Sequence, residues 1–187
     1  MIDSEWSGKK LHVGCGRKDI PGFINLDLIP FPHVDFVGYA HDLSQFADCS
    51  LSMIYASHVL EYYDWEDAEK CLREWKRTLI PGGLIRLAVP NFTALIEVYQ
   101  STGSLAAVIG PLYGRIESVQ GMAYHKSVFD RHTLENLLIR VGLTQIHSWN
   151  WQEVDHGDYD DCSQAYFPHM DKVNGLHVSL NLQASKP

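Results

Sequence analysis

The sequence lacks the features of membrane, secreted and metal-scaffold proteins. Its apolar runs are all shorter than the ~18 residues of a membrane span, and Met1–Trp6 has no basic region followed by an apolar one. The few cysteines are irregularly spaced with no CxxC pair, which argues against a zinc or thioredoxin-like site. We therefore expect a cytoplasmic chain with no membrane span. Four reduced thiols are expected: Cys15, Cys49, Cys71 and Cys162.

Positive charge is also scarce. The chain has 15 Lys and Arg against 23 Asp and Glu, for a formal net charge of -8. Sequence-independent nucleic-acid binding depends on basic side chains that release counterions, so no nucleic-acid partner is expected. A local basic strip of Arg73, Lys76 and Arg77 fits the solvated face of a helix better than a phosphate-binding surface.

The length and composition are those of an ordinary globular protein. The 187 residues are 45% hydrophobic and 20% charged, and they contain no internal repeat. A chain of this size can bury one substantial core but not two. We expect residues 1–187 to form a single domain.

Short apolar runs alternate with helical patterns along the chain. This alternation predicts an α/β fold, a Rossmann-like, seven-stranded, mostly parallel sheet with helices on both faces. Helices are expected over Trp65–Leu79, from Asn91 or Thr93 to Tyr99, and from Asp130 or Thr133 to Val141. The expected strands are Lys10–Val13, Phe23–Leu28, Asp35–Tyr39, Met53–Ala56, Leu84–Val89, Gln145–Trp149 and His177–Ala184.

Three segments differ from this pattern. The last strand, His177–Ala184, alternates polar and apolar residues, which predicts an antiparallel strand at the sheet edge with one face in water. Residues 103–126 and 155–171 show no clear periodicity. We interpret them as lid or acceptor-binding segments beside the carboxyl edge of the sheet.

A glycine turn follows the first strand. Gly14-Cys15-Gly16 would let a ligand approach the backbone without a Cβ in the way. Asp27 closes the second expected strand, where a carboxylate can accept both ribose hydroxyls, and Asp42 follows the third. Each feature alone also fits a turn or a helix cap. Together, at successive strand ends, they indicate an adenosine site.

The glycine turn argues against a dinucleotide. The third glycine of GxGxxG is missing, and Pro21-Gly22 interrupts any helix that could hold a pyrophosphate at its N-terminus. S-adenosylmethionine (SAM) has no phosphate and needs only close backbone approach, a ribose acceptor and an adenine pocket. The sequence therefore favours SAM, with a nicotinamide-dependent enzyme as a distant alternative.

The sequence resembles the class I SAM-dependent methyltransferases, specifically the small type 11 group. Many members of this group are associated with polysaccharide biosynthesis. The likeness covers nearly the whole chain. It rests on Leu11-His12-Val13-Gly14-Cys15-Gly16, on Asp27, on Asp42-Leu43, on Ile54-Tyr55-Ala56-Ser57-His58-Val59-Leu60-Glu61 and on Leu79-Ile80-Pro81-Gly82-Gly83-Leu84.

The resemblance implies a cofactor site. Gly14 and Gly16 would pass the methionine half of SAM, Asp27 would hold the ribose, and Asp42 with Leu43 would frame the adenine. The residues implied in cofactor binding are Gly14, Cys15, Gly16, Asp27, Leu28, Asp42, Leu43, Ser57 and His58.

Two features depart from the family. The usual acid before the glycine loop is His12, and the helix after that loop has shrunk to about a turn. A non-catalytic SAM-fold binding module is therefore kept as the alternative to an enzyme.

Methyl transfer to a hydroxyl also needs a base. Histidine suits this role near neutral pH. We expect His125 as the first candidate, because its irregular segment should lie over the crevice, and His58 as the second. Glu61 could orient His58, or could serve as a first-turn acid of a helix.

The expected acceptor is a small molecule or glycan, methylated on oxygen, with nitrogen as the second choice. Residues 155–161 are acidic and could attract a divalent cation, but they lack EF-hand spacing, and no metal is expected. The sequence gives no indication of the oligomeric state.

Overall fold

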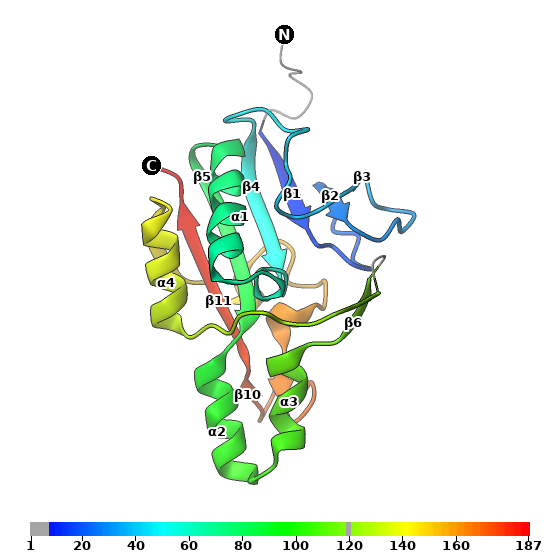
Figure 1. The fold of residues 1–187 in the computed structure, drawn as a ribbon, viewed down its shortest axis with the longest axis vertical. Coiled ribbons are helices and arrows are strands. Elements are labelled where there is room, and N and C mark those ends of the chain that lie inside the picture. Colours follow the sequence, from blue (N-terminus) through cyan, green and yellow to red (C-terminus); the bar gives the residue numbers. More distant parts are fainter. Residues whose placement is uncertain (1–7, 119–120) are drawn as a thin grey trace.

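The computed structural model describes residues 8–118 and 121–187 and is built on one seven-stranded sheet (Figure 1). Its strand order is β3-β2-β1-β4-β5-β11-β8. β11 is antiparallel to β5 and β8, and the β1 to β5 pairs are parallel. The predicted fold class is confirmed. The strands are β1 (Lys9–Val13), β2 (Phe23–Asp27), β3 (Phe36–Val37), β4 (Leu51–Ser57), β5 (Leu79–Pro90), β8 (Thr144–Ser148) and β11 (Ser179–Ser185).

Two helices cover one face of this sheet. α1 (Trp65–Thr78) begins at Asp64, whose side chain accepts a hydrogen bond from the Asp67 backbone. α4 (Arg131–Arg140) begins at Asp130, which forms a capping box with Thr133. Both helices turn apolar residues toward the sheet and complete the main core. The predicted helices at these places are confirmed.

The opposite face lacks the expected α-helices in the described part of the chain. It is covered by residues 149–165, which contain only the short 3₁₀ helices η3 (Trp151–Glu153) and η4 (Cys162–Gln164). The β1–β2 and β2–β3 connections are too short for crossover helices. The expectation of helices on both faces was therefore wrong for this face of the sheet. A second core forms here from Ile20, Phe23, Met53, Tyr55, Ala88 and Trp149.

The last strand does not lie at the sheet edge. β11 lies between β5 and β8, and Ser179 and Asn181 are buried beneath the segment that contains η4. The Ser179 hydroxyl donates to Asn181 Oδ1 at 2.9 Å, and Asn181 Nδ2 donates to the Ser163 carbonyl at 3.0 Å. These internal partners replace water. The alternation of polar residues was therefore misleading about exposure.

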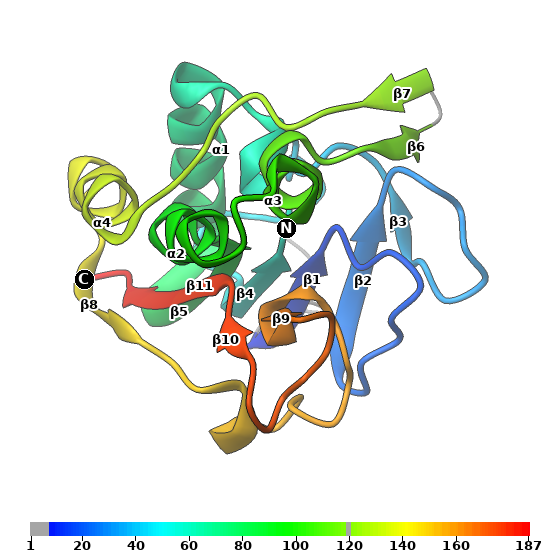
Figure 2. The same ribbon diagram turned by 90° about the horizontal axis from the view of Figure 1, so that it is seen from below.

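The segments without clear periodicity lie beyond and beside the carboxyl edge of the sheet. α2 (Phe92–Thr102) and α3 (Leu105–Tyr113) extend past that edge (Figures 1 and 2). None of the described helices combines the length and apolar character needed to cross a membrane. Met1–Trp6, where no targeting segment is expected, lies outside the described residues. The remaining elements are η2 (Leu60–Tyr62), β6 (Ile116–Ser118), β7 (Gly121–Ala123), β9 (Tyr166–Phe167) and β10 (Leu176–His177).

Candidate functional site

The glycine turn lies at the carboxyl end of β1, against the end of β4. Gly14 and Gly16 both have left-handed backbone angles, with φ of 63° and 56°. A Cβ on Gly14 would lie 2.4 Å from Cγ2 of Val59, whereas a Cβ on Gly16 would meet none of the described atoms within 4 Å. The close packing of Gly14 against Val59 thus holds the turn next to the end of β4. Gly16 leaves open space where a ligand can approach the backbone.

Asp27 is fixed beside this turn by two backbone amides. The Gly16 amide donates to Asp27 Oδ2 and the Ile29 amide to Asp27 Oδ1, each at 2.8 Å. The carboxylate is partly exposed, and each of its oxygens has a further lone pair for another donor. This arrangement fits the predicted ribose acceptor. It also fits SAM, since an exposed acceptor lies next to an open glycine.

The other predicted cofactor residues have mixed surroundings. The Cys15 thiol is buried, and burial raises its pKa to about 12. Leu28 is partly buried and Asp42 is exposed, where it accepts a hydrogen bond from the Ser44 amide. Leu43 has no exposed surface, and its amide donates to Glu74. Its side chain belongs to the core and offers no surface to an adenine.

The structure brings the two predicted base candidates together around Glu61. The Glu61 carboxyl oxygen Oε1 lies 3.4 Å from Nδ1 of His58 and 3.9 Å from Nε2 of His125. His58 follows β4 directly and has a φ of 55°, which is strained for a non-glycine residue. Its amide donates to the Ala88 carbonyl at 2.8 Å, which fixes this backbone. Such strain is common at functional sites.

The two imidazoles differ in access. The His58 side chain is 17% exposed and its Nε2 lies 3.2 Å from the Ser179 hydroxyl. The His125 side chain is 7% exposed, and its Nδ1 lies 3.0 Å from the Pro111 carbonyl. Each imidazole has a neighbouring polar group at both ring nitrogens. The larger exposed fraction of the His58 side chain therefore favours His58 over His125.

Burial shifts the proton affinities of this cluster in opposite directions. It raises the pKa of Glu61 to about 8 and lowers the pKa of His58 to about 3. The pKa of His125 is lowered by burial as well. The charged form of each group is disfavoured away from water. At neutral pH the imidazoles are neutral and Glu61 is protonated.

A polar hollow of about 350 Å³ adjoins this cluster. Ser179, the partner of His58, forms part of its wall. Arg131 Nη1 donates to the Ser148 hydroxyl at 2.7 Å on the same wall. Most of the lining side chains are hydroxyls, amides and aromatic nitrogen heterocycles. They are Asn91, Thr93, Arg131, Ser148, Trp149, His177, Ser179, Leu180 and Asn181.

The acidic stretch 155–161 is paired with the protein itself. Asp155 forms an ion pair with Lys10, and Asp160 with Lys172 at 3.0 Å. Asp161 accepts hydrogen bonds from Tyr55 at 2.6 Å and from Ser57, a predicted site residue, at 3.2 Å. Among residues 8–118 and 121–187, no three His, Cys, Asp or Glu side chains gather as a metal site would require.

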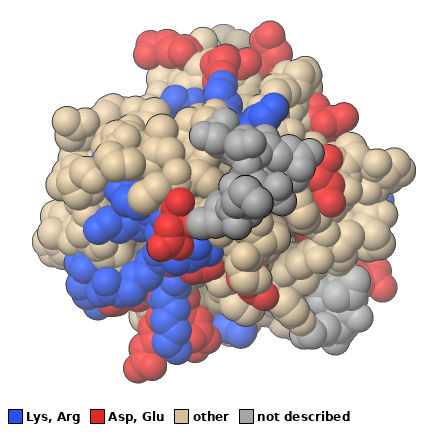
Figure 3. All heavy atoms as spheres, turned by 90° about the horizontal axis from the view of Figure 1, so that it is seen from above, with Lys and Arg blue, Asp and Glu red and all other residues tan. Residues whose placement is uncertain are grey.

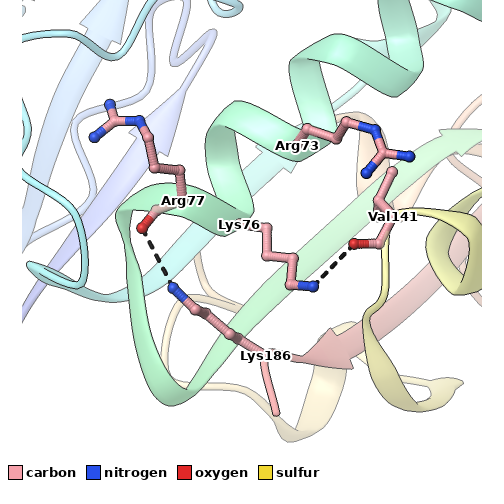
Figure 4. A pocket seen from close by; sticks show the side chains of 5 residues that line it. All are labelled: Arg73, Lys76, Arg77, Val141 and Lys186. Carbon is pink, nitrogen blue, oxygen red and sulfur yellow. Dashed lines mark hydrogen bonds between the residues drawn. The ribbon is translucent and has the colours of Figure 1, made fainter.

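The basic strip lies at the other end of the sheet. Together with Lys186 and Val141 it lines a hollow of about 220 Å³, on the side where Lys and Arg gather in Figure 3. The Lys76 and Lys186 amino groups point at the carbonyls of Val141 and Arg77 (Figure 4). These cations satisfy carbonyls at the C-terminal ends of helices, where positive charge is favourable. The strip is thus a structural contact rather than only a solvated face.

Two contacts of the site had no signal in the sequence. Val59 reads as an ordinary apolar residue, yet it fixes the distance between β4 and the glycine turn. Asp161 cannot be distinguished by pattern from its acidic neighbours, and its partners lie more than a hundred residues away. Both roles depend on strand order, which brings distant segments together.

Comparison with known proteins agrees with this geometry. Residues 25–87, from β2 into β5, match the family described as methyltransferase domain. Among curated proteins, none is significantly similar to the chain. Solved structures share the fold at low identity.

Three of these solved structures illustrate the match. A SAM-dependent methyltransferase from Thermotoga maritima, described as a possible histamine N-methyltransferase, is 16% identical with a TM-score of 0.60 over 97% of this chain and 83% of its own. A SAM-dependent methyltransferase from Methanosarcina mazei is 14% identical with a TM-score of 0.58 over 97% and 93%. The 1,6-didemethyltoxoflavin-N1-methyltransferase from Burkholderia thailandensis, solved with S-adenosylhomocysteine, is 13% identical with a TM-score of 0.56 over 96% and 72%.

The domain match, the shared fold and the open glycine turn beside Asp27 point to the same kind of protein. The chain has the fold of the SAM-dependent methyltransferases, and residues 25–87 match the family described as methyltransferase domain.

Proposed function

We propose that this protein is a SAM-dependent methyltransferase that transfers the methyl group of SAM to a hydroxyl oxygen of a small polar acceptor, sugar-containing molecules included, with His58 as the base. The observation that carries the proposal is the position of His58, which directly follows β4, adjoins the residue packed on the glycine turn and has Glu61 behind it. The sequence alone ranks His125 first, and the greater exposure of the His58 side chain reverses that order.

In this proposal each site residue has a separate role in the reaction. SAM, when bound, would supply an electrophilic methyl group on a sulfonium, with S-adenosylhomocysteine as the leaving product. Asp27 would hold the ribose and Gly16 would lie against the methionine half, while His58 Nε2 would accept the proton of the acceptor's hydroxyl group. Ser179, which contacts this nitrogen and lines the polar hollow, would guide the hydroxyl toward it.

The polar hollow supports a hydroxyl-rich acceptor. Its amide and hydroxyl side chains can exchange hydrogen bonds with a polyol, and Trp149 adds an apolar wall. Residues 103–126 and 155–171 would cover the site. Two contacts support this role: the Lys126 and Ser127 amides donate to the Glu61 carbonyl, and Asp161 accepts from Tyr55.

Replacing Asp27 with alanine tests the cofactor half of the proposal. Loss of hydrogen bonds to a charged acceptor costs about 1.5–3 kcal/mol, so D27A should bind SAM roughly 10- to 100-fold more weakly. Calorimetric titration with SAM measures the change. Asp35 is the matched control because its carboxylate accepts the Asn25 amide in the neighbouring loop. D35A should keep wild-type affinity; equal affinity in D27A and wild type would refute the ribose assignment.

Replacing His58 with glutamine tests the chemical half. Loss of a general base reduces turnover by about 10²- to 10⁴-fold, and the assay is run at saturating SAM so that any loss of cofactor affinity does not affect the rate. Release of S-adenosylhomocysteine is measured over a panel of hydroxyl and amine acceptors. The exposed His41 provides the control, H41Q, with normal turnover expected. Full turnover of a hydroxyl acceptor by H58Q would exclude His58 as the base, and turnover of amines alone would favour the nitrogen alternative.

A further inference from the structure

The carboxyl group of Glu61 is the most unusual buried group near the site. The residue is 1% exposed, and neither carboxyl oxygen has a hydrogen-bond partner among the described residues. Its backbone carbonyl, in contrast, accepts from the amides of Lys126 and Ser127 at 2.8 and 3.1 Å. These bonds hold η2 against the segment that carries His125. Glu61 is therefore fixed in place while its side chain remains without a formed hydrogen bond.

The tautomer of His125 is set by its other contact. The Pro111 carbonyl can only accept, so Nδ1 of His125 carries a proton and donates it at 3.0 Å. A neutral His125 then presents the lone pair of Nε2 to Glu61 Oε1, 3.9 Å away. Two lone pairs facing each other in a dry site repel. A proton on Glu61 removes the negative charge that would otherwise face this lone pair.

His58 faces the same carboxyl oxygen from the other side. Its Nδ1 lies 3.4 Å from Glu61 Oε1, so one carboxyl group serves two imidazoles. When Glu61 is protonated, it can donate to either ring. When Glu61 is ionised, it accepts from His58 Nδ1, which leaves the lone pair on Nε2, the nitrogen beside Ser179. The protonation of Glu61 thus decides which nitrogen of His58 is basic.

We propose that Glu61 is a positioning residue that holds the proton shared by His58 and His125, and that release of this proton orients His58 as the base. This inference rests on the proposed function of His58. Burial raises the pKa of Glu61 to about 8, so base formation is expected to increase as the pH rises through that value. The other titratable groups near Glu61 and His58 are Tyr62, Cys162, Asp161 and His177.

The proton position can be measured in the wild-type enzyme by NMR titration from pH 5 to 10. With ¹³C-labelled glutamate, the Glu61 Cδ signal should titrate with a midpoint near pH 8. With ¹⁵N-labelled histidine, the His58 and His125 ring signals should show a step at the same pH. A Glu61 midpoint below pH 6 would overturn the proposal. This measurement needs no variant, so misfolding cannot leave the question open.

Variants then link the two observations. E61Q removes the ionisable group at similar shape, and the histidine step near pH 8 should disappear. Glu66, exposed in the first turn of α1, gives the matched control E66Q, which should retain it. H125Q replaces the lone pair with an amide donor and should lower the Glu61 midpoint by at least about one pH unit. A histidine step that survives in E61Q contradicts the shared proton.

A failure of the proposed function would give a different result from a failure of the role of Glu61. SAM titration of the same samples reports cofactor binding, and H58Q reports the base. Normal SAM binding and a large loss in H58Q, together with an unchanged histidine titration in E61Q, would reject the role of Glu61 alone. An H58Q enzyme with full hydroxyl turnover would reject the base assignment whatever Glu61 does.

Discussion

Substitution of Gly14 by alanine should destabilise the enzyme by several kcal/mol and abolish tight SAM binding. The new Cβ would lie 2.4 Å from Cγ2 of Val59, which is much closer than carbon atoms approach. Overpacking of this kind costs about 1–3 kcal/mol. The left-handed φ of 63° adds roughly 1–2 kcal/mol for any residue with a Cβ. Denaturant unfolding and SAM calorimetry measure the two effects.

Gly16 separates the two causes. G16A has the same left-handed strain, with a φ of 56°, but its Cβ meets none of the described atoms within 4 Å. It should therefore lose only about 1–2 kcal/mol. The double variant G14A/V59A removes the clashing methyl groups and should recover part of the stability lost in G14A. Equal losses in G14A and G16A would show that contact with Val59 has no influence.

The enzyme should lose stability steeply as the pH falls below about 6.5. Burial lowers the pKa of His12 to about 4, of His156 to about 4 and of His58 to about 3. In the unfolded chain these imidazoles take up protons near the ordinary pKa of about 6.5, while the folded state stays neutral. Each therefore lowers the free energy of unfolding by about 1.4 kcal/mol per pH unit in this range.

Glu61 acts with the opposite sign. Its pKa is raised to about 8, so the folded state keeps a proton that the unfolded chain releases, and its contribution to stability grows as the pH falls toward the ordinary carboxyl pKa. Above pH 6.5 this carboxyl dominates. Below it, the three histidines with the lowest pKa values oppose one carboxyl, which leaves a net loss of about 3 kcal/mol per pH unit. The lowered pKa values of His125 and His177 act in the same direction. Stability should therefore be highest near pH 6.5.

His12 provides the test of this slope. Its ring is buried between Phe23 and Tyr55, and its Nδ1 has no partner among the described residues. The variant H12F keeps an aromatic ring and should reduce the acid slope by about 1.4 kcal/mol per pH unit in denaturant unfolding. H132Q, at an exposed position, should leave the slope unchanged. A free energy of unfolding that is constant from pH 6.5 to 5 would contradict the burial argument.

The sequence predicted the features that depend on neighbouring residues. Apolar periodicity located the strands and the helices, and Asp130 was correctly placed among the candidate caps because its capping box with Thr133 is formed within one turn. The glycine turn and Asp27 were also predicted as a unit. Their roles follow from local backbone geometry at two strand ends, and the amide of Gly16 does bond to Asp27.

Exposure and partners across the sheet could not be predicted in this way. β11 alternates like an edge strand, but it lies between β5 and β8, and the segment that contains η4 buries Ser179 and Asn181. Leu43 follows Asp42 in a family-like motif, yet it lies wholly in the core. The polarity of a side chain does not reveal whether another segment or water will satisfy it.

The amino-acid sequence by itself determined the class of fold, the glycine turn and the acid that follows it, because these depend on backbone preferences and spacing within short segments. Only the tertiary structure decided which histidine is accessible and that Glu61 faces both. His58 and His125 belong to distant segments, and their meeting at one buried carboxyl depends on the packing of the 124–127 segment against η2. Burial then sets the proton affinities, since desolvation exists only once the chain has folded.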